Sequence, residues 1–415
     1  MNFIDLFAGA GGFSEGFQSV GGKCLAHVEM MPEACATLLT REAFYYLRQH
    51  KKRAIYDDYL AGKISRTALL EEIPQSIKDK VICCEMKDDN MNDLYRIIDK
   101  NRKDKPVDVL LGGPPCQAYS LVGRARTNMS KDPRNHLYLL YLQFLAHYKP
   151  KLLVFENVRG ILSAGDGQYF ADLKKKCHEI GYVVKDRLLK AEDYGVLQRR
   201  RREIIIGIRQ DLYHDGISFP FPKTQNQLFK DFEVKDLFLD LPPLVPGETN
   251  NTYVGKPSDY LLLSGIRGND DNVLTWHTTR PINDHDREIY RFVIEFNEKF
   301  GRNPLYTEIP ARLQSHKNHK SFLDRFKIVS PHSHAAQTMV AHIAKDGHYF
   351  IYPDRQQARS ISVREAARIQ SFPDNYFFEG SRTSAFLQIG NAVPPLLSKA
   401  IATSLESFLA SGKRG

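Results

Sequence analysis

The sequence predicts an α/β protein built on a doubly wound, mostly parallel sheet, with a second, smaller and loop-rich domain. Three observations support this prediction. Strand-like and helix-like segments alternate through the first two hundred residues, a glycine-rich turn follows the first strand, and polar residues end several apolar runs. Strands that alternate with helices favour a parallel sheet, because each crossover between parallel strands needs a long connection. The length of 415 residues exceeds that of most single cores, which favours two domains.

Seven short apolar runs are expected to form strands, at 3–7, 23–28, 80–84, 107–111, 152–155, 182–189 and 203–208. The stretches 137–148 and 169–180 are expected to be helices between them. Residues 41–79 are long for one connection, and their charged, helical composition predicts an inserted helical hairpin. After about residue 210 the pattern becomes irregular, and 218–285 is rich in Pro, Gly, Asn and Asp, which indicates long loops. Order returns in two amphipathic helices, at 362–372 and 394–409.

We therefore expect a first domain over 1–213, a second over 214–377, and a C-terminal segment, 378–415, that returns to the first. The composition is that of an ordinary globular protein, with 42% hydrophobic and 26% charged residues. A net charge of +9 suits a polyanionic partner. We find no apolar run of membrane-spanning length, no basic start of a signal peptide and no regular spacing of the six cysteines. We expect a cytoplasmic protein with reduced thiols and no membrane contact.

The stretch FIDLFAGAGGFSEGF, residues 3–17, combines a strand, a glycine-rich turn and a helix start. Gly9, Gly11 and Gly12 allow a sharp bend and a close approach to a ligand. Glu29 ends the next strand, at a spacing typical of an acidic residue that binds ribose hydroxyls. The loop has Ser14 where the dinucleotide pattern G-x-G-x-x-G has its last glycine. This favours another adenosine-type cofactor, such as S-adenosylmethionine, over a dehydrogenase; the alternative is a tight turn with no ligand.

The stretch GGPPCQAYS, residues 112–120, places Cys116 after two prolines at the end of an apolar run. In open α/β sheets this carboxyl edge is where ligands bind. Cys116 is therefore either a rigidly presented thiol or a buried structural cysteine beside a turn.

Two further strand ends carry ionic residues. Glu156 ends the strand in LLVFENVRG, where partial burial of a carboxylate could let it share a proton with a ring nitrogen. The stretch GVLQRRRREIII places Gln198 and four arginines, 199–202, before an apolar strand. Alternate side chains of an extended stretch share a face, so Arg200 and Arg202 are expected to point the same way. A phosphate, a carboxylate or a base oxygen would suit them; the alternatives are a surface glutamate at a turn and a solvated basic edge.

Taken in order, the stretches DLFAGAGGFSEGF, VEM, GGPPCQAYS, FENVRG, QRRRR, VREAARIQSFPD and IGNAVPP make the chain resemble the DNA (cytosine-5) methyltransferases of the prokaryotic type. They cover most of residues 1–209 and 362–396. The resemblance implies a Rossmann-like class I methyltransferase domain and methyl transfer from S-adenosylmethionine to carbon 5 of a flipped-out cytosine in a short duplex DNA sequence. It implies that the 214–377 region is a target-recognition domain.

The resemblance also implies roles for individual residues. Cys116 would add to carbon 6 of the cytosine, Glu156 would share a proton with ring nitrogen 3, Arg202 would hold the exocyclic oxygen, and Arg200 would organise the loop of the thiolate. The expected cofactor contacts are Phe7, Ala8, Gly9, Gly11, Gly12, Phe13, Glu29, Met30, Glu85, Pro115, Leu137, Asn391 and Ala392. Asp88 and Asp89 are alternatives to Glu85 for the contact to the adenine.

The expected DNA contacts are Gln117, Ser120, Arg124, Gln198, Lys317 and Lys320. The loop 118–134 is expected to form a lid over the flipped base. Residues 311–327 contain five Lys or Arg and one Asp, which favours contacts with phosphates. Histidines 316, 319, 332 and 334 have no cysteine near them, so we expect no metal site.

The expected partner is double-stranded DNA, and we expect a bacterial or phage-encoded monomer that belongs to a restriction-modification or epigenetic marking system. A cognate restriction endonuclease is left open as a second partner. Two other functions remain as alternatives: a transfer-RNA cytosine-5 methyltransferase of the same fold, and a catalytically silent DNA-binding accessory protein.

Overall fold

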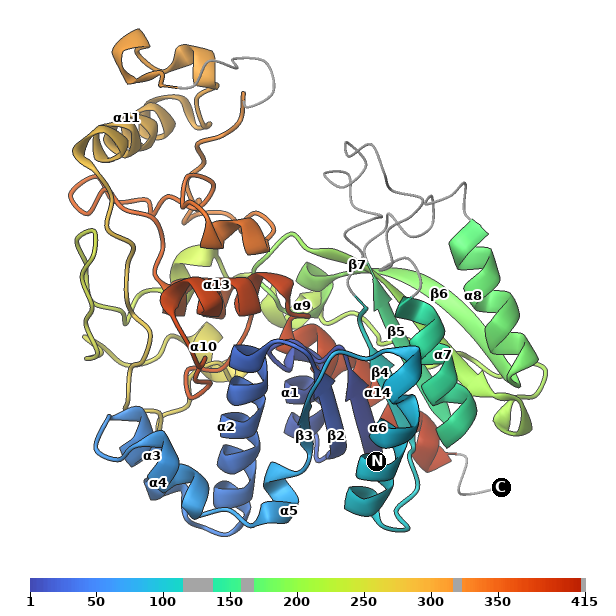
Figure 1. Cartoon of the computed structure of the whole chain (residues 1–415). Helices are drawn as coiled ribbons and strands as arrows, with labels where there is room; N and C mark the ends of the chain where they lie inside the picture. The colour runs from blue at the N-terminus through green and yellow to red at the C-terminus, as the bar shows by residue number, and fades with distance from the viewer. Residues whose placement is uncertain (115–136, 158–167, 316–322, 412–415) are drawn as a thin grey trace.

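The computed structural model of the chain describes residues 1–114, 137–157, 168–315 and 323–411. Within them lies a seven-stranded sheet of order β3-β2-β1-β4-β5-β7-β6 (Figure 1). Neighbouring strands from β3 to β5 pair in parallel, and β7 runs antiparallel to both β5 and β6. All seven predicted strands are present, with small shifts at their ends, which confirms the predicted fold class. The strands are β1 (Asn2–Leu6), β2 (Lys23–Glu29), β3 (Val81–Cys83), β4 (Val109–Gly112), β5 (Leu152–Asn157), β6 (Tyr182–Lys190) and β7 (Arg201–Arg209).

Helices cover both faces of the sheet. One face packs against α6 (Met91–Arg102), α7 (Leu137–Tyr148) and α8 (Gln168–Glu179). The other face packs against α1 (Gly12–Ser19) and α14 (Pro395–Ser411), and α2 (Pro32–Gln49) lies beside β2 and β3. Along β1 the side chains alternate between the two cores: Phe3 belongs to the α1–α14 side, and Ile4 and Leu6 to the α6–α8 side. Because α14 comes from the end of the chain, the C-terminal segment completes the helical layer that α1 begins on this face of the sheet.

The inserted segment is helical, but it does not form the predicted hairpin. It consists of the end of α2 and three short helices, α3 (Arg53–Leu60), α4 (Arg66–Glu71) and α5 (Gln75–Lys78). Gly62 has a φ of 69°, Ser65 accepts a hydrogen bond from the backbone of Ala68 as the N-cap of α4, and Pro74 precedes α5. These breaks prevent two long helices from forming, and the short ones share a small core with α2.

The second half of the chain contains few regular elements. Besides α14, the α-helices among its described residues are α9 (Asn226–Phe229), α10 (Asp259–Ser264), α11 (Asp284–Phe300), α12 (Val363–Ile369) and α13 (Arg382–Asn391). Two cores hold this region. One lies around α10, α12 and α13, and the other packs α11, in a separate lobe, against Tyr306, Ile309, Leu313, Phe326, Ile328 and Ile351 (Figure 1). Helix α12 begins at a capping box of Ser362 and Glu365, inside the predicted 362–372 segment. Since α13 shares the core of α12, packing continues across residue 377, and the division into domains at that point stays a prediction.

A buried ionic network ties this region together. Arg368 donates to the carboxylates of Asp240 and Asp374 at 2.5 Å each, and all three side chains are fully buried. Arg359 pairs with Glu365 at 2.8 Å in the same core. Buried charges without partners are costly, so these pairs favour one arrangement of α12 against residues 237–240.

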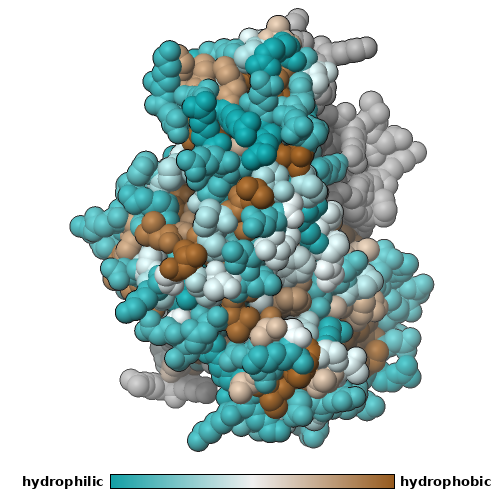
Figure 2. All heavy atoms as spheres, turned by 90° about the vertical axis from the view of Figure 1, so that its left-hand side faces the viewer, coloured by the Kyte–Doolittle hydropathy of each residue, from teal (hydrophilic) through white to brown (hydrophobic). Residues whose placement is uncertain are grey.

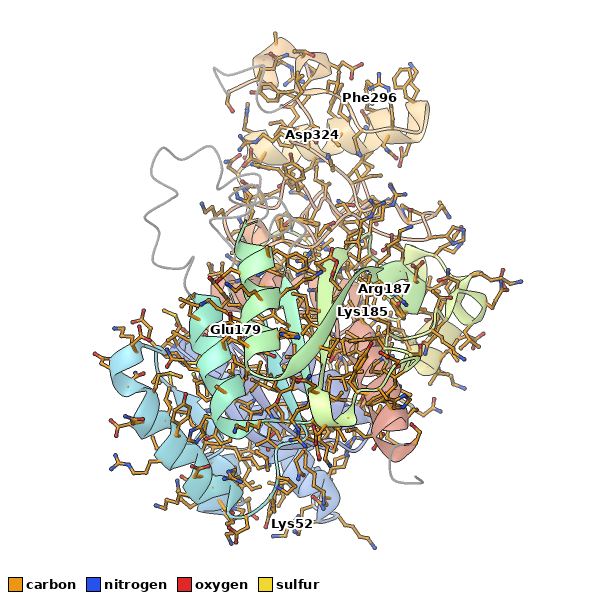
Figure 3. The ribbon with its side chains drawn as sticks, turned by 90° about the vertical axis from the view of Figure 1, so that its right-hand side faces the viewer. Lys52, Glu179, Lys185, Arg187, Phe296 and Asp324 are labelled. Carbon is orange, nitrogen blue, oxygen red and sulfur yellow. The ribbon has the colours of Figure 1, made fainter. Side chains whose placement is uncertain are left out.

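The edge strand β6 is covered by cation–ring contacts. Lys185 and Arg187 lie side by side on β6 (Figure 3), over the rings of Phe219 and Phe221 at 4.9 and 4.5 Å. The opposite side of the molecule, on which α10 and α11 lie, is largely hydrophilic with small separate apolar patches (Figure 2). Among the described residues, no helix combines the length and the apolar character that crossing a membrane requires.

Candidate active site

The glycine loop follows β1 at the carboxyl edge of the sheet. Phe7, Gly9 and Gly11 have φ values of 55°, 54° and 73°, so the chain makes a sharp left-handed bend between β1 and α1. A Cβ atom on Gly12 would lie 2.1 Å from the carbonyl oxygen of Val393. Only glycine fits there, because the segment that contains the predicted cofactor residues Asn391 and Ala392 continues directly against the loop.

Glu29 ends β2 and binds the glycine loop directly. Its carboxylate accepts hydrogen bonds from the backbone N–H of Gly9 at 2.8 Å and from those of Met30 and Met31 at 2.9 Å each. A carboxylate offers about four acceptor positions. Three are used here, so one remains for a hydroxyl of a ligand. Glu29 is 8% exposed, which places this position at the rim of the loop.

The other predicted cofactor residues differ in their exposure. Met30 follows Glu29 and is 58% exposed, which is unusual for a large apolar side chain and leaves it open to a ligand. Leu137 is half-buried at the start of α7, and Ala8 is half-buried in the loop. Phe7 packs partly against the core on the α6–α8 side.

Phe13 is a correction to the sequence analysis. It is 5% exposed and belongs to the core between the sheet and α14. Phe13 lies on the first turn of α1, and that turn is covered by α14, which a local sequence pattern does not reveal. Within the glycine loop, the aromatic ring that stays partly exposed is that of Phe7.

The structure does not favour any one of the three acidic residues after β3 as the adenine contact. Glu85, Asp88 and Asp89 are all exposed. Glu85 pairs with Lys87 at 2.8 Å, and Asp88 accepts a hydrogen bond from Gln143 of α7 at 2.7 Å. The choice among the three for the adenine contact stays as open as it is in the sequence.

Two predicted catalytic residues lie together at the same edge. Arg202 Nε lies 2.6 Å from Glu156 Oε1, and each side chain is largely buried. The strands place them: Glu156 is near the end of β5, Arg202 is near the start of β7, and these strands are antiparallel neighbours. A Cβ atom on Gly113 would lie 3.1 Å from Glu156 Oε2, so the pair lies beside the start of the GGPPC loop.

Arg200, two residues before Arg202, turns inward, whereas Arg199 and Arg201 are exposed. Arg200 donates to the carbonyl oxygens of Met339 at 2.6 Å and Ala392 at 2.9 Å, and it is almost fully buried. It therefore clamps the C-terminal segment to the sheet. The expected role of Arg200 in organising the thiolate loop stays a prediction, because that loop lies outside the described residues.

Gln198 is a second correction, because it has no exposed surface with which to contact DNA. Its amide donates to Gln370 at 2.6 Å and its carbonyl oxygen accepts from the backbone of Met339 at 2.8 Å. The side chain joins residues that are far apart in the sequence, so its burial could not be read from the neighbouring arginines. Asn391, by contrast, is exposed at the end of α13.

Several predicted residues lie outside the described parts of the chain. They are Cys116, Pro115, Gln117, Ser120 and Arg124 in the loop after β4, and Lys317 and Lys320 in the basic stretch. Their assignments stay predictions. In the described part of the basic stretch, Arg312 pairs with Glu288 at 2.6 Å and Lys327 with Asp324 at 2.6 Å.

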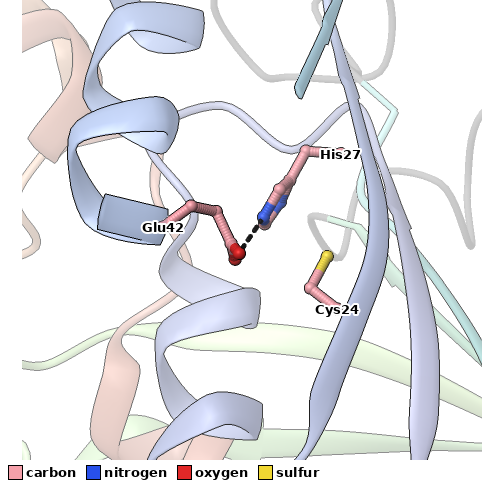
Figure 4. A group of neighbouring side chains, drawn as sticks. All are labelled: Cys24, His27 and Glu42. Carbon is pink, nitrogen blue, oxygen red and sulfur yellow. Dashed lines mark hydrogen bonds and ion pairs between the residues drawn. The ribbon is translucent and has the colours of Figure 1, made fainter. Parts of the chain in front are cut away.

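A buried polar cluster under the glycine loop was missed by the sequence analysis. Cys24, His27 and Glu42 lie together between β2 and α2 (Figure 4), with ligand-type atoms within 4.8 Å of one another. Glu42 also accepts from Lys80 at 2.6 Å and from Gln18, and burial raises the pKa of the Cys24 thiol well above its usual range. The Lys80 ammonium group already pairs with the Glu42 carboxylate, and the Cys24 thiol stays protonated. Both features favour a hydrogen-bond network over a metal site. The available signal was the presence of Cys24 and His27 inside an apolar strand, β2.

Comparison with known proteins gives a consistent family assignment. The sequence profile described as C-5 cytosine-specific DNA methylase matches residues 1–64 and 75–407. The type II methyltransferase M.Bpa9945I of Bacillus paralicheniformis is 38% identical over 453 aligned positions, which cover 99% of both chains. The type II methyltransferase M1.HphI of Haemophilus parahaemolyticus is 30% identical, over 98% of this chain and 86% of its own.

A solved structure supports the fold. A prophage-encoded protein from Escherichia coli, described as a DNA modification methyltransferase, superimposes with a TM-score of 0.65 at 22% identity and covers 99% of both chains. The profile spans most of the chain and the relatives are aligned over nearly all of it, so neither a transfer-RNA enzyme nor a silent accessory protein is favoured. The chain belongs to the C-5 cytosine-specific DNA methylase family and is a DNA (cytosine-5-)-methyltransferase.

Proposed function

We propose that the protein is a sequence-specific modification enzyme that methylates a flipped-out cytosine through a covalent adduct with Cys116. The observation that supports this most is the Glu156–Arg202 pair at the carboxyl edge of the sheet, 2.6 Å apart and beside Gly113 of the GGPPC loop. A carboxylate and a guanidinium at this edge suit the ring nitrogen and the exocyclic oxygen of a cytosine that has left its duplex.

The edge of the sheet fits S-adenosylmethionine as the methyl donor on two observations. Glu29 keeps one acceptor position at the glycine loop, and Met30 is exposed beside it. The residues that would hold the cofactor are therefore Glu29, Met30, Phe7 and the backbone of the loop. When bound, S-adenosylmethionine supplies the methyl group from its sulfonium.

The chain's own residues would prepare the base. Cys116 forms a bond from its thiolate sulfur to carbon 6 of the ring, which makes carbon 5 nucleophilic. Glu156 shares a proton with ring nitrogen 3, so that negative charge does not build up on the ring. Arg202 holds Glu156 in place and offers N–H donors to the exocyclic oxygen. Loss of the proton from carbon 5 and release of the thiolate complete turnover.

The names of the relatives support a role in restriction and modification. M.Bpa9945I and M1.HphI are both type II methyltransferases, so we propose that this enzyme protects host DNA and that a restriction endonuclease accompanies it. We also propose that it acts as a monomer on double-stranded DNA in the cytoplasm of a bacterial or phage-infected cell. The 214–377 region, with its basic 311–327 stretch, would supply sequence recognition.

Bisulfite sequencing of a plasmid from cells that express the chain tests this proposal. We expect one short sequence to carry 5-methylcytosine with the wild type and none with Glu156→Gln. A parallel assay offers purified enzyme duplex DNA and transfer RNA, and we expect methylation of the DNA only. Methylation of transfer RNA alone, or an unmodified plasmid with the wild type, would refute the proposed function.

A further inference from the structure

Ser14 occupies the position at which the loop departs from the dinucleotide pattern, and the structure shows what its side chain contacts. The hydroxyl is buried, and its oxygen lies 2.5 Å from Asp5 Oδ2, within hydrogen-bond distance. The same oxygen lies 3.2 Å from Nδ1 of His27. On the far side of the ring, Nε2 lies 3.2 Å from Oε1 of Glu42. A chain of hydrogen bonds thus runs from β1 through the first turn of α1 to β2 and α2.

The sheet register explains why these side chains meet. Asp5 and His27 are paired residues on the parallel strands β1 and β2, so their side chains leave the same face. Glu29 lies two residues beyond His27 on that same face, where it binds Gly9 of the loop. The chain of hydrogen bonds therefore lies directly beneath the glycine loop. Ser14 connects these hydrogen bonds to α1, the helix that follows the loop.

Other charged groups surround this chain on every packed element. Cys24 and Glu29 lie on β2, and Glu42 and Arg41 lie on α2. Arg41 pairs with Glu15 of α1 at 2.6 Å, and Lys80 precedes β3. Lys80 and Gln18 both donate to Glu42. Burial raises the pKa of Glu42, but Lys80 and His27 outweigh it and bring this pKa down to about 2, so Glu42 is ionised at neutral pH. Glu42 can then only accept a hydrogen bond from His27.

The number of protons on Asp5, Ser14 and His27 decides whether every contact can form. If Asp5 is protonated, it donates to Ser14, Ser14 donates to Nδ1, and Nε2–H donates to Glu42. If the proton is on His27 instead, Nδ1–H donates to Ser14 and Ser14 donates to Asp5. When that proton is lost, the one hydroxyl hydrogen of Ser14 cannot serve both the Asp5 carboxylate and Nδ1. One buried acceptor then lacks a donor, which is destabilising.

We propose that Asp5, Ser14 and His27 are positioning residues that hold one shared proton and so keep the glycine loop in its ligand-binding conformation. This rests on the proposed function only in taking S-adenosylmethionine as the ligand of the loop. The consequence is that binding of the cofactor weakens when the proton is lost. No substrate contact is assigned to these three residues, because all of them are buried.

The sign of the pH dependence follows from the Asp5 carboxyl. Burial raises its pKa, which His27 and Ser14 only partly oppose, and the result is about 6 against an ordinary value of 3.8. A raised pKa means that the protonated form is favoured in the folded protein. The stabilisation is therefore complete below about pH 4 and is lost as pH rises through about 6.

The Asp5→Asn variant separates the proton from the hydrogen bonds. An asparagine amide donates to Ser14 without titrating, so the chain stays complete at every pH. We expect the dissociation constant of wild-type protein for S-adenosylmethionine, measured by calorimetry from pH 5.5 to 9, to rise as the pH passes through about 6 and to level off about tenfold higher. For Asp5→Asn we expect a flat profile. Ser14→Ala breaks the chain, and we expect about tenfold weaker binding at pH 5.5.

A matched control is Asp108→Asn, an aspartate at the amino end of β4 that bonds Asn2 and Lys151 instead. We expect it to keep the wild-type pH profile. Equal pH profiles for wild type and Asp5→Asn would overturn the inference. Nitrogen-15 NMR of His27 without cofactor gives a second readout. The shared proton is supported if the Nδ1 signal shifts with pH in wild type and stays constant in Asp5→Asn. Identical spectra for the two proteins refute it. If wild type binds no S-adenosylmethionine at any pH, the cofactor assignment fails, and the NMR comparison still decides the inference.

Discussion

Replacing Glu29 tests the link between the glycine loop and the cofactor. One carboxylate accepts three backbone N–H groups at 2.8–2.9 Å and keeps one position for a ribose hydroxyl. A hydrogen bond to a charged group contributes about 1.5–3 kcal/mol. Glu29→Ala removes the ribose contact and the anchor of Gly9, so we expect S-adenosylmethionine affinity to fall by about 1–3 kcal/mol, roughly 5- to 150-fold.

The Glu29→Gln variant makes this prediction more specific. Its carbonyl oxygen can still accept from Met30 and Met31, but its NH2 group then faces the N–H of Gly9. We expect an affinity between those of wild type and Glu29→Ala. Calorimetry measures the cofactor, and a DNA-binding assay without cofactor is expected to show little change for either variant. Glu33→Gln, the same substitution on the exposed first turn of α2, is the control. Unchanged cofactor affinity in Glu29→Ala would refute the assignment of the ribose contact.

Three further predictions follow from other parts of the molecule. Glu156→Gln and Arg202→Ala are each expected to reduce the methylation rate by about 100-fold or more, since proton transfer of this kind contributes about 10²–10⁴-fold. We expect S-adenosylmethionine binding to stay unchanged. Single-turnover assays measure the rate, and a wild-type rate in either variant would contradict the role of the pair. Arg368→Ala leaves Asp240 and Asp374 buried without their shared cation, so we expect unfolding free energy to fall by about 3–5 kcal/mol in denaturant titrations, and a change below about 1 kcal/mol would refute the importance of the network. Lys317→Ala with Lys320→Ala is expected to weaken cognate and unrelated duplexes alike and to make the salt slope shallower by about one unit per lost phosphate contact, whereas an unchanged slope with a new set of methylated sites would show that these lysines contact bases.

The fold and the loop were predictable because their signals are local. Apolar runs of strand length, the glycine turn and Glu29 at a strand end all lie within short stretches of sequence, and the structure places each as expected. The Glu156–Arg202 pair was predicted only as two separate roles. Its contact depends on β5 and β7 being antiparallel neighbours, which the order of the strands along the chain does not reveal.

The residues predicted wrongly depend on contacts with distant segments. Phe13 is covered by α14, and Gln198 binds Gln370, which is more than one hundred positions away. A run of arginines before a strand looks the same in sequence whether its members face DNA or clamp the C-terminal segment. The polar chain of Asp5, Ser14 and His27 was missed for the same reason, since only the register of β1 and β2 brings these residues together.

Duplex DNA with 5-fluorocytosine at the target position tests the central claim most directly, because fluorine at carbon 5 cannot leave as a proton does. With S-adenosylmethionine present, wild-type protein is expected to form a complex with this duplex that survives denaturing electrophoresis, and mass spectrometry is expected to locate the linkage at Cys116. The Cys116→Ser variant is expected to bind the cofactor normally and to form no such complex. Normal turnover by Cys116→Ser, or a wild-type protein that methylates cytosine but is never trapped, would contradict the covalent mechanism.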